Sequence, residues 1–152
     1  MDSSMDRKIR ADKLIKDFAY GSSLTGFIPI PFVDTIGLIG VQRVMIYKLS
    51  KIYNTPYSKE LAKVWISTLM SGLTTSAVSP LLGSAVKLIP GIGTIAGGTT
   101  MAVLGSSSTY AIGKVFQQHF EKGGTLDNFN TEEAKETLHQ ELEKGIYLAN
   151  KD

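Results

Sequence analysis

Residues 65–113 read WISTLMSGLTTSAVSPLLGSAVKLIPGIGTIAGGTTMAVLGSSSTYAIG, a run of 49 residues in which Lys87 is the only charged side chain. A helix at the surface of a soluble protein needs a polar face, which charged side chains normally supply. Gly, Ser, Thr and Ala fill this run instead, and Pro80 and Pro90 interrupt it. The run is therefore buried in protein or in lipid, and both alternatives predict an all-α fold.

Two stretches of this run, 65–86 and 88–113, each exceed the roughly 20 residues that cross the hydrocarbon layer of a bilayer. A transmembrane hairpin of the two would place basic residues on one side, as the positive-inside rule requires: Lys59, Lys63, Lys114 and Lys122. The abundance of Ser, Thr and Gly and a mean hydropathy of only +0.05 argue against lipid. We expect transmembrane or membrane-associated hairpins, with a soluble helical bundle as the alternative.

The overall composition excludes several function classes. With 16 Lys and Arg against 14 Asp and Glu, the net charge of +2 is too balanced to predict nucleic-acid binding. Basic residues gather in residues 7–16 and 43–63, whereas acidic residues gather after residue 121. The absence of cysteine excludes disulfides, thiolate catalysis and zinc–thiolate sites. The N-terminal residues are too charged for a secretory signal.

The chain is long enough for one domain, and we expect a single helical domain over residues 1–152. Its parts are a basic amphipathic helix over 5–20, a proline-started unit over 21–54, an apolar helical hairpin over 57–122 and an amphipathic C-terminal helix over 131–145. Glycine and serine breaks are predicted at 21–23 and at Gly145, and Gly123-Gly124 is predicted to end the preceding helix. Ile9, Ile15, Phe18 and Ala19 are expected to share the apolar face of the first helix.

An internal repeat relates residues 31–53 to residues 90–116. IPFVDTI at 30–36 matches IPGIGTI at 89–95, and LSKIY at 49–53 matches IGKVF at 112–116. The spacing between the two matches differs by four residues, close to one helical turn, so both copies would present the same face. We interpret the copies as two related units, each a proline-broken entry followed by a long helix.

The same two blocks carry a family resemblance: IPIPFVDTIGLIGVQRVMIYKLSKIYN, residues 28–54, and KLIPGIGTIAGGTTMAVLGSSSTYAIGKVFQQHFEKGG, residues 87–124. Over residues 19–145 the chain resembles the bacterial YcjF-like, GTPase-associated domain of unknown function, as a stand-alone copy without the GTPase. The matching residues are Pro31, Asp34, Gln42, Met45, Tyr53, Pro90, Gly91, Gly93, Thr94, Tyr110, Gly113, Phe120, Gly123 and Gly124. The resemblance implies a helical, membrane-associated domain that is often fused to, or encoded beside, an Era-like or dynamin-like GTPase.

No enzymatic site is predicted. The chain has no P-loop, because around Gly113-Lys114 a serine stands at 108 for the first glycine and a valine at 115 for Ser or Thr. His119 and His139 lie on different predicted helices without metal-ligand spacing, and the resembling family offers no catalytic residues to transfer. We therefore expect a non-enzyme without a cofactor or metal, and a GTPase would act in trans.

Asp34 is the main candidate functional residue, and it has two alternative interpretations. It is either an acid favoured by the dipole at a helix start, or an intramembrane carboxylate that lines a polar cavity or pairs with Lys87, Arg43 or a partner chain. The glycines around Pro90 resemble a phosphate loop without its strand, so close helix packing is the better interpretation. The candidate functional or packing residues are Asp34, Gln42, Arg43, Lys87, Pro31, Pro90, Gly91, Gly93 and Gly97.

Together these patterns predict a non-enzymatic membrane-associated helical protein that self-associates, in membrane remodelling or pore formation. The family resemblance implies that it works with a GTPase in trans. The alternative is a soluble oligomerising helical adaptor without lipid contact. The expected partners are a lipid membrane, further copies of the chain and a GTPase, and no nucleic acid. The expected location is the bacterial inner membrane with cytoplasmic termini, or the cytoplasm for the alternative.

Overall fold

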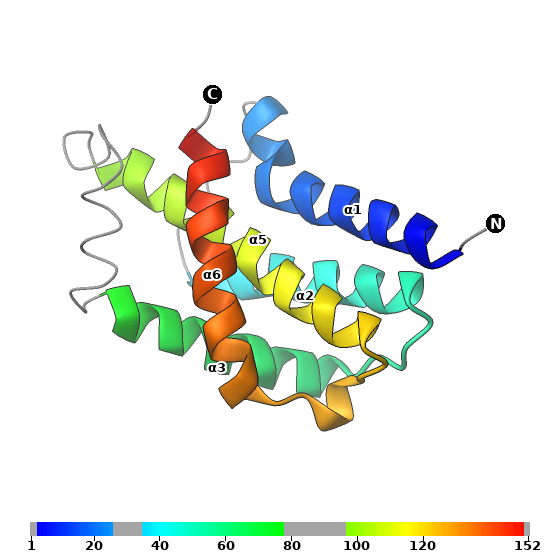
Figure 1. The fold of residues 1–152 in the computed structure, drawn as a ribbon. Coiled ribbons are helices and arrows are strands. Elements are labelled where there is room, and N and C mark those ends of the chain that lie inside the picture. Colours follow the sequence, from blue (N-terminus) through cyan, green and yellow to red (C-terminus); the bar gives the residue numbers. More distant parts are fainter. Residues whose placement is uncertain (1–2, 26–34, 78–96, 151–152) are drawn as a thin grey trace.

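The structure, a computed structural model, describes residues 3–25, 35–77 and 97–150. Within these ranges every regular element is helical, which confirms the predicted all-α class (Figure 1). The elements are α1 (Ser3–Thr25), α2 (Thr35–Ile52), α3 (Lys59–Ala77), α5 (Gly97–Glu121), the short 3₁₀ helix η1 (Leu126–Asn128) and α6 (Thr131–Asn150).

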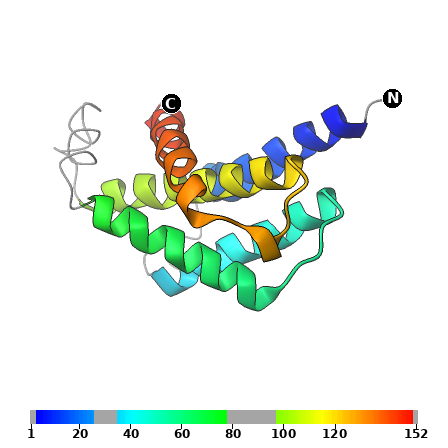
Figure 2. The same cartoon turned by 60° about the horizontal axis from the view of Figure 1, so that its bottom comes forward.

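Helix α5 is the centre of the bundle and contacts every other α-helix. It runs parallel to α2, since Gln42 bonds Thr109 and Tyr53 bonds Glu121. It runs antiparallel to α1, since Asp12 pairs with Lys114 while Tyr20, further along α1, meets Tyr110. In Figure 2, α2 and α3 lie on one side of α5 and most of α6 lies on the other.

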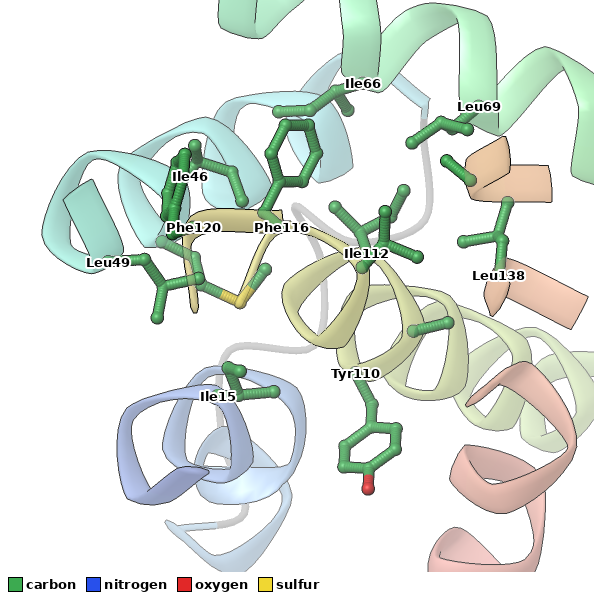
Figure 3. Packing of buried hydrophobic residues seen from close by; sticks show 14 of the residues in the cluster. Ile15, Ile46, Leu49, Ile66, Leu69, Tyr110, Ile112, Phe116, Phe120 and Leu138 are labelled. Atoms are coloured by element: carbon green, nitrogen blue, oxygen red, sulfur yellow. The ribbon is translucent and has the colours of Figure 1, made fainter. Parts of the chain in front are cut away.

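The core gathers apolar side chains from all these helices around α5. Phe116 is fully buried, and its ring stacks on Phe129 at 4.6 Å between centroids and 8° between planes. Figure 3 shows Phe116 between Ile46 of α2 and Ile66 of α3. In the same view Ile112 lies toward Leu69 of α3 and Leu138 of α6, and Ile15 of α1 lies on another side of α5. Burial of such large side chains contributes about 1.5–3 kcal/mol each, so this cluster dominates the stability of the fold.

Two helices end in the same type of cap. At the end of α5, the Gly123 N–H donates to the Phe120 carbonyl and the Gly124 N–H to the His119 carbonyl, with Gly123 at φ +88°. This is the Schellman arrangement, and it confirms the predicted end at Gly123-Gly124. Asn54, at φ 55°, takes the glycine's place at the end of α2. Both caps make the following chain turn sharply.

Two predicted helix breaks are wrong. Helix α1 continues through 21–23 to Thr25, and α6 continues through Gly145 to Asn150. Glycine inside a helix costs about 1 kcal/mol relative to alanine, a penalty that packing easily offsets. At Gly145 the packing is visible, because a Cβ there would lie 3.0 Å from the Ser107 carbonyl oxygen of α5. Gly145 is therefore a contact residue of the α5–α6 crossing.

The predicted apolar face of α1 is also partly wrong. Ile15 and Ala19 are buried as expected, and Ala11 joins them. Ile9, however, is 59% exposed. Residues 11, 15 and 19 follow the helical repeat of four, which places residue 9 on another side of the helix.

Candidate functional site

Three of the nine candidate residues lie in the described part of the chain: Gln42, Arg43 and Gly97. Gly97 is the first residue of α5. The other six lie outside the described residues: Pro31, Asp34, Lys87, Pro90, Gly91 and Gly93. Both proline entries of the predicted repeat therefore also lie outside them.

Gln42 is a buried link between two helices. Its side chain is fully buried, and its Nε2 donates to the Thr109 Oγ1 of α5 at 3.1 Å. Its Oε1 has no partner among the described residues. Because an unmade buried hydrogen bond is costly, the pair fixes the register of α2 on α5. Gln42 thus has a packing role in this fold.

The described helices are charge-free toward one end of the bundle. No charged residue occurs in 18–25 of α1, 35–42 of α2, 64–77 of α3 or 97–113 of α5. The parallel and antiparallel pairings bring these four segments to the same end, on the left in Figure 1. We call this the uncharged end, and it is assembled from four segments far apart in the sequence.

Charges on the rest of the bundle are segregated by sign. The α2–α3 hairpin, residues 35–77, carries five basic residues and one acid, a net charge of +4: Arg43, Lys48, Lys51, Lys59, Lys63 and Glu60. Residues 126–150, with α6, carry six acids and two lysines, a net charge of −4. The hairpin is thus the most basic part of the described chain and the region with α6 the acidic part. Residues 3–25 of α1 carry five basic residues and three acids, a smaller net charge of +2.

Helix α2 presents basic and aromatic side chains together on its outer surface. Val44 is 45% exposed and Tyr47 is 42% exposed, and Lys48 and Lys51 on the same helix are also exposed. The Lys51 Nζ lies 5.3 Å from the centroid of the Tyr47 ring, within cation–π range. We call this surface the basic aromatic face; it consists of Arg43, Val44, Tyr47, Lys48, Lys51 and Tyr57.

Tyr57, in the turn after α2, completes this face. Its ring meets the Tyr47 ring edge to face, with 5.1 Å between centroids. Its hydroxyl lies 3.5 Å from the Arg43 carbonyl oxygen, the long end of the hydrogen-bond range. Burial raises the pKa of the Tyr57 phenol; Arg43 opposes the rise and Glu60 adds to it. Tyr57 is not among the residues predicted from the sequence, although its place directly after Asn54-Thr55-Pro56, a typical turn sequence, was a usable signal.

Other aromatic residues at the ends of the uncharged stretches serve the core. Tyr53 and Tyr110 are buried, and the Tyr53 hydroxyl donates to Glu121 Oε2 at 2.8 Å. The Trp65 Nε1 donates to the Leu126 carbonyl at 2.9 Å. Among the four aromatic residues Tyr47, Tyr53, Trp65 and Tyr110, which flank the uncharged stretches, Tyr47 is the one exposed in this structure.

A polar cluster between α1 and α5 was also missed. Asp12 Oδ1 accepts from Lys114 Nζ at 2.7 Å and from Gln117 Nε2 at 3.0 Å. Burial raises the pKa of the Asp12 carboxyl, but the hydrogen bonds from Lys114 and Gln117 and the Lys114 charge outweigh burial and leave the pKa below its usual value. These contacts attach α1 to the central helix.

Replacing Asp12 by asparagine is expected to weaken the fold near neutral pH and to have a smaller effect in acid. A carboxylate whose pKa is lowered by folding stabilises the protein above its unfolded pKa of about 3.9, and this contribution disappears as the pH falls through the folded pKa. The side chain is 36% exposed. Screening therefore limits the effect to less than about 1 kcal/mol.

Urea unfolding of wild type and Asp12→Asn at about pH 6 and about pH 3 measures this difference. Asp17→Asn is the matched control, because Asp17 forms only an exposed pair with Lys13. A stability difference for Asp12→Asn that does not change with pH would contradict the assignment.

Neither histidine has a metal-site arrangement. Within the described ranges, no three His, Cys, Asp or Glu side chains are grouped to hold a metal ion. The His119 Nε2 lies 2.7 Å from the Thr125 carbonyl oxygen and 3.1 Å from Asn128 Oδ1. His119 thus fastens η1 to the end of α5.

The predicted transmembrane stretches 65–86 and 88–113 fall partly outside the described residues. Among the helices of 3–25, 35–77 and 97–150, none combines the length and the apolar character needed to cross a membrane.

Comparison with known proteins assigns the family. Residues 3–145 match the family described as "Domain of unknown function (DUF697)". The chain belongs to the DUF697 family. This DUF697 chain is also 33% identical over 149 residues to "Magnetosome membrane protein 22" of Magnetospirillum gryphiswaldense, an alignment that covers 97% of the chain and 76% of the relative. No solved structure matches the DUF697 chain.

Proposed function

We propose that this chain is a non-enzymatic, membrane-associated helical protein whose uncharged end contacts the bilayer. The observation that carries the proposal is the assembly of four charge-free helix segments at one end of the fold. The segments 26–34 and 78–96 join these same helix ends and contain one charged residue each, Asp34 and Lys87. A relative named as a magnetosome membrane protein supports the proposal.

The position of the basic aromatic face along α2 agrees with this orientation. At about 1.5 Å per residue, Tyr47 lies about 18 Å and Lys51 about 24 Å from the start of α2. One leaflet contributes about 15 Å of hydrocarbon. If the uncharged end enters one leaflet, Tyr47 and Lys51 reach the headgroup region, where tyrosine and lysine are favoured. We place the charged end of the bundle on the cytoplasmic side of the bacterial inner membrane.

Vesicle flotation of the full chain tests the proposal, with Ser71 as the informative position. Ser71 is an exposed residue within the charge-free part of α3. Ser71→Asp would bring a carboxylate to the bilayer, whereas Ser71→Asn adds a side chain of the same size without charge. A charge within a membrane costs a few kcal/mol, so we expect the aspartate variant to bind at least about tenfold more weakly.

The asparagine variant is expected to float with vesicles like wild type. Circular dichroism of both variants checks that α3 remains folded. Wild-type protein that stays at the bottom of the gradient would contradict the proposal. Equal flotation of the aspartate and asparagine variants would contradict the assigned contact region.

Self-association and a GTPase partner form the second part of this proposal. Lys59 and Lys63 of α3 are exposed and lie outside the basic aromatic face. They and the −4 region with α6 are complementary surfaces on one chain, which favours contact between copies. The GTPase partner rests on the family resemblance and would act in trans. Sedimentation velocity tests self-association, and a pull-down that requires bound nucleotide tests the GTPase.

A further inference from the structure

We propose that the basic aromatic face of α2 binds the headgroups of anionic phospholipids and so makes membrane binding depend on lipid charge. This inference rests on the proposed function, because it specifies the lipid class that the membrane contact selects. It starts from three cations on one helix surface, Arg43, Lys48 and Lys51.

Within the described residues, no ion pair neutralises the positive charge of this face. The ion pairs there involve α1, α5 and α6, and none includes Arg43, Lys48 or Lys51. Glu60 is the one acid in the hairpin, residues 35–77. In the part of the chain that the structure describes, an external anion can therefore approach these cations without displacing an ion-pair partner.

The apolar members of the face point to a lipid surface rather than to a polyanion in water. Val44 and the Tyr47 ring are about half exposed between the cations. Tyr57 supports the Tyr47 ring edge to face, and Lys51 lies over that ring with its ammonium free to reach outward. Mixed apolar and cationic side chains suit the boundary between acyl chains and anionic headgroups.

A second copy of the chain is the competing occupant. The region of residues 126–150 carries a net charge of −4 and could meet the hairpin of another molecule. Its charges are, however, partly paired within the region, since Lys135 lies 3.4 Å from Glu132 and Lys144 lies 3.5 Å from Glu141. Of the exposed large hydrophobic side chains among the described residues, this region contributes Tyr147 alone. It therefore offers little apolar surface to Val44 and Tyr47, and a lipid surface fits better.

The experiment compares binding to neutral phosphatidylcholine vesicles and to vesicles with about 30 mol% phosphatidylglycerol. The test variant is Lys48→Gln/Lys51→Gln, which keeps long polar side chains on an exposed surface. Each basic residue at an anionic surface contributes about 1 kcal/mol, so the variant should bind anionic vesicles about 30-fold more weakly than wild type. Its binding to neutral vesicles should be unchanged.

Lys122→Gln/Lys135→Gln is the matched control. It also removes two positive charges at exposed positions, Lys135 on α6 and Lys122, which lines a pocket together with Glu133 of α6. Electrostatic attraction decays over about 8–10 Å at physiological salt, so this control should retain wild-type binding to anionic vesicles. A loss that is equal in the two double variants would show a net-charge effect and would overturn the inference.

The remaining outcomes separate this inference from the proposed function. Wild-type binding that is equal on neutral and anionic vesicles overturns the inference and leaves the membrane proposal standing. Failure to bind either vesicle overturns both. If Lys48→Gln/Lys51→Gln instead dissociates oligomers in vesicle-free solution and binds anionic vesicles normally, the face belongs to a second copy and the inference is wrong.

Discussion

Replacing Phe116 by alanine is expected to lower the free energy of unfolding by about 3–5 kcal/mol. Phe116 is fully buried on the central helix, stacks on Phe129 and lies 6.2 Å from the Phe120 ring centroid. Alanine would leave a cavity between α5, α3 and the residue that follows η1. The side chains around this cavity belong to different elements of the fold, so they cannot move together to fill it. Such a loss is a large fraction of the roughly 5–15 kcal/mol of a typical domain.

Urea unfolding followed by circular dichroism measures this effect. Tyr147→Ala is the control, because Tyr147 is also aromatic but 68% exposed on α6. The control is expected to change stability by no more than about 0.5 kcal/mol. A Phe116→Ala loss below about 1 kcal/mol would contradict the packing described around α5.

Replacing Gly113 by alanine is expected to destabilise the protein by about 1–3 kcal/mol, although alanine is the better helix former. An added Cβ would lie 2.8 Å from Ile15 Cγ1, 2.9 Å from Ile15 Cγ2 and 3.1 Å from Met45 Sδ. Ile15 and Met45 are fully buried, and the two Ile15 atoms branch directly from its Cβ. The clash is therefore relieved only by moving α1 away from α5.

Gly72→Ala is the matched control for this prediction. Gly72 lies inside α3, and an added Cβ there meets nothing within 4 Å. Helix propensity alone should then make the control more stable by up to about 1 kcal/mol. The measurement is the midpoint of thermal unfolding, and the two substitutions should shift it in opposite directions. Shifts of the same sign would mean that α1 does not cross α5 at Gly113.

The sequence predicts the presence of the helices better than it predicts which glycines mark their ends. The Gly123-Gly124 end was predictable, since the apolar pattern also stops there. Gly145 gives the same local signal inside a helix, and its role depends on the approach of Ser107 from a helix some 38 positions earlier in the chain. A local pattern holds no information about that approach.

The two copies of the predicted repeat can be compared over their second match, 49–53 with 112–116, because both proline entries lie outside the described residues. Leu49 and Ile112 are both buried, as are Tyr53 and Phe116. The pair Lys51 and Lys114 differs, because Lys114 binds Asp12 and Lys51 lies over an exposed ring. The two helices therefore share an apolar pattern and differ in their polar contacts.

The charges of the candidate site could be predicted from the sequence, but which of its side chains face the solvent could not. The charge-free stretches and the basic cluster at 43–63 are visible in the sequence alone. Whether an aromatic ring faces the core or the solvent is decided by the helix packed against it. Tyr53 meets Glu121 on α5, whereas the exposed ring of Tyr47 meets Tyr57 and Lys51. The order of residues along the chain does not reveal that difference.

The opposite net charges of the α2–α3 hairpin and the α6 region give the molecule a permanent electric dipole. In Figure 2 the hairpin lies on one side of α5 and most of α6 on the other, so the two charges are spatially separated. Near a negatively charged surface, the electric field of the surface attracts the hairpin and repels α6. The molecule therefore rotates until the hairpin faces the surface, before the two come into contact. The fold thus sets the direction of approach, and productive collisions depend on ionic strength even where the final contact is apolar.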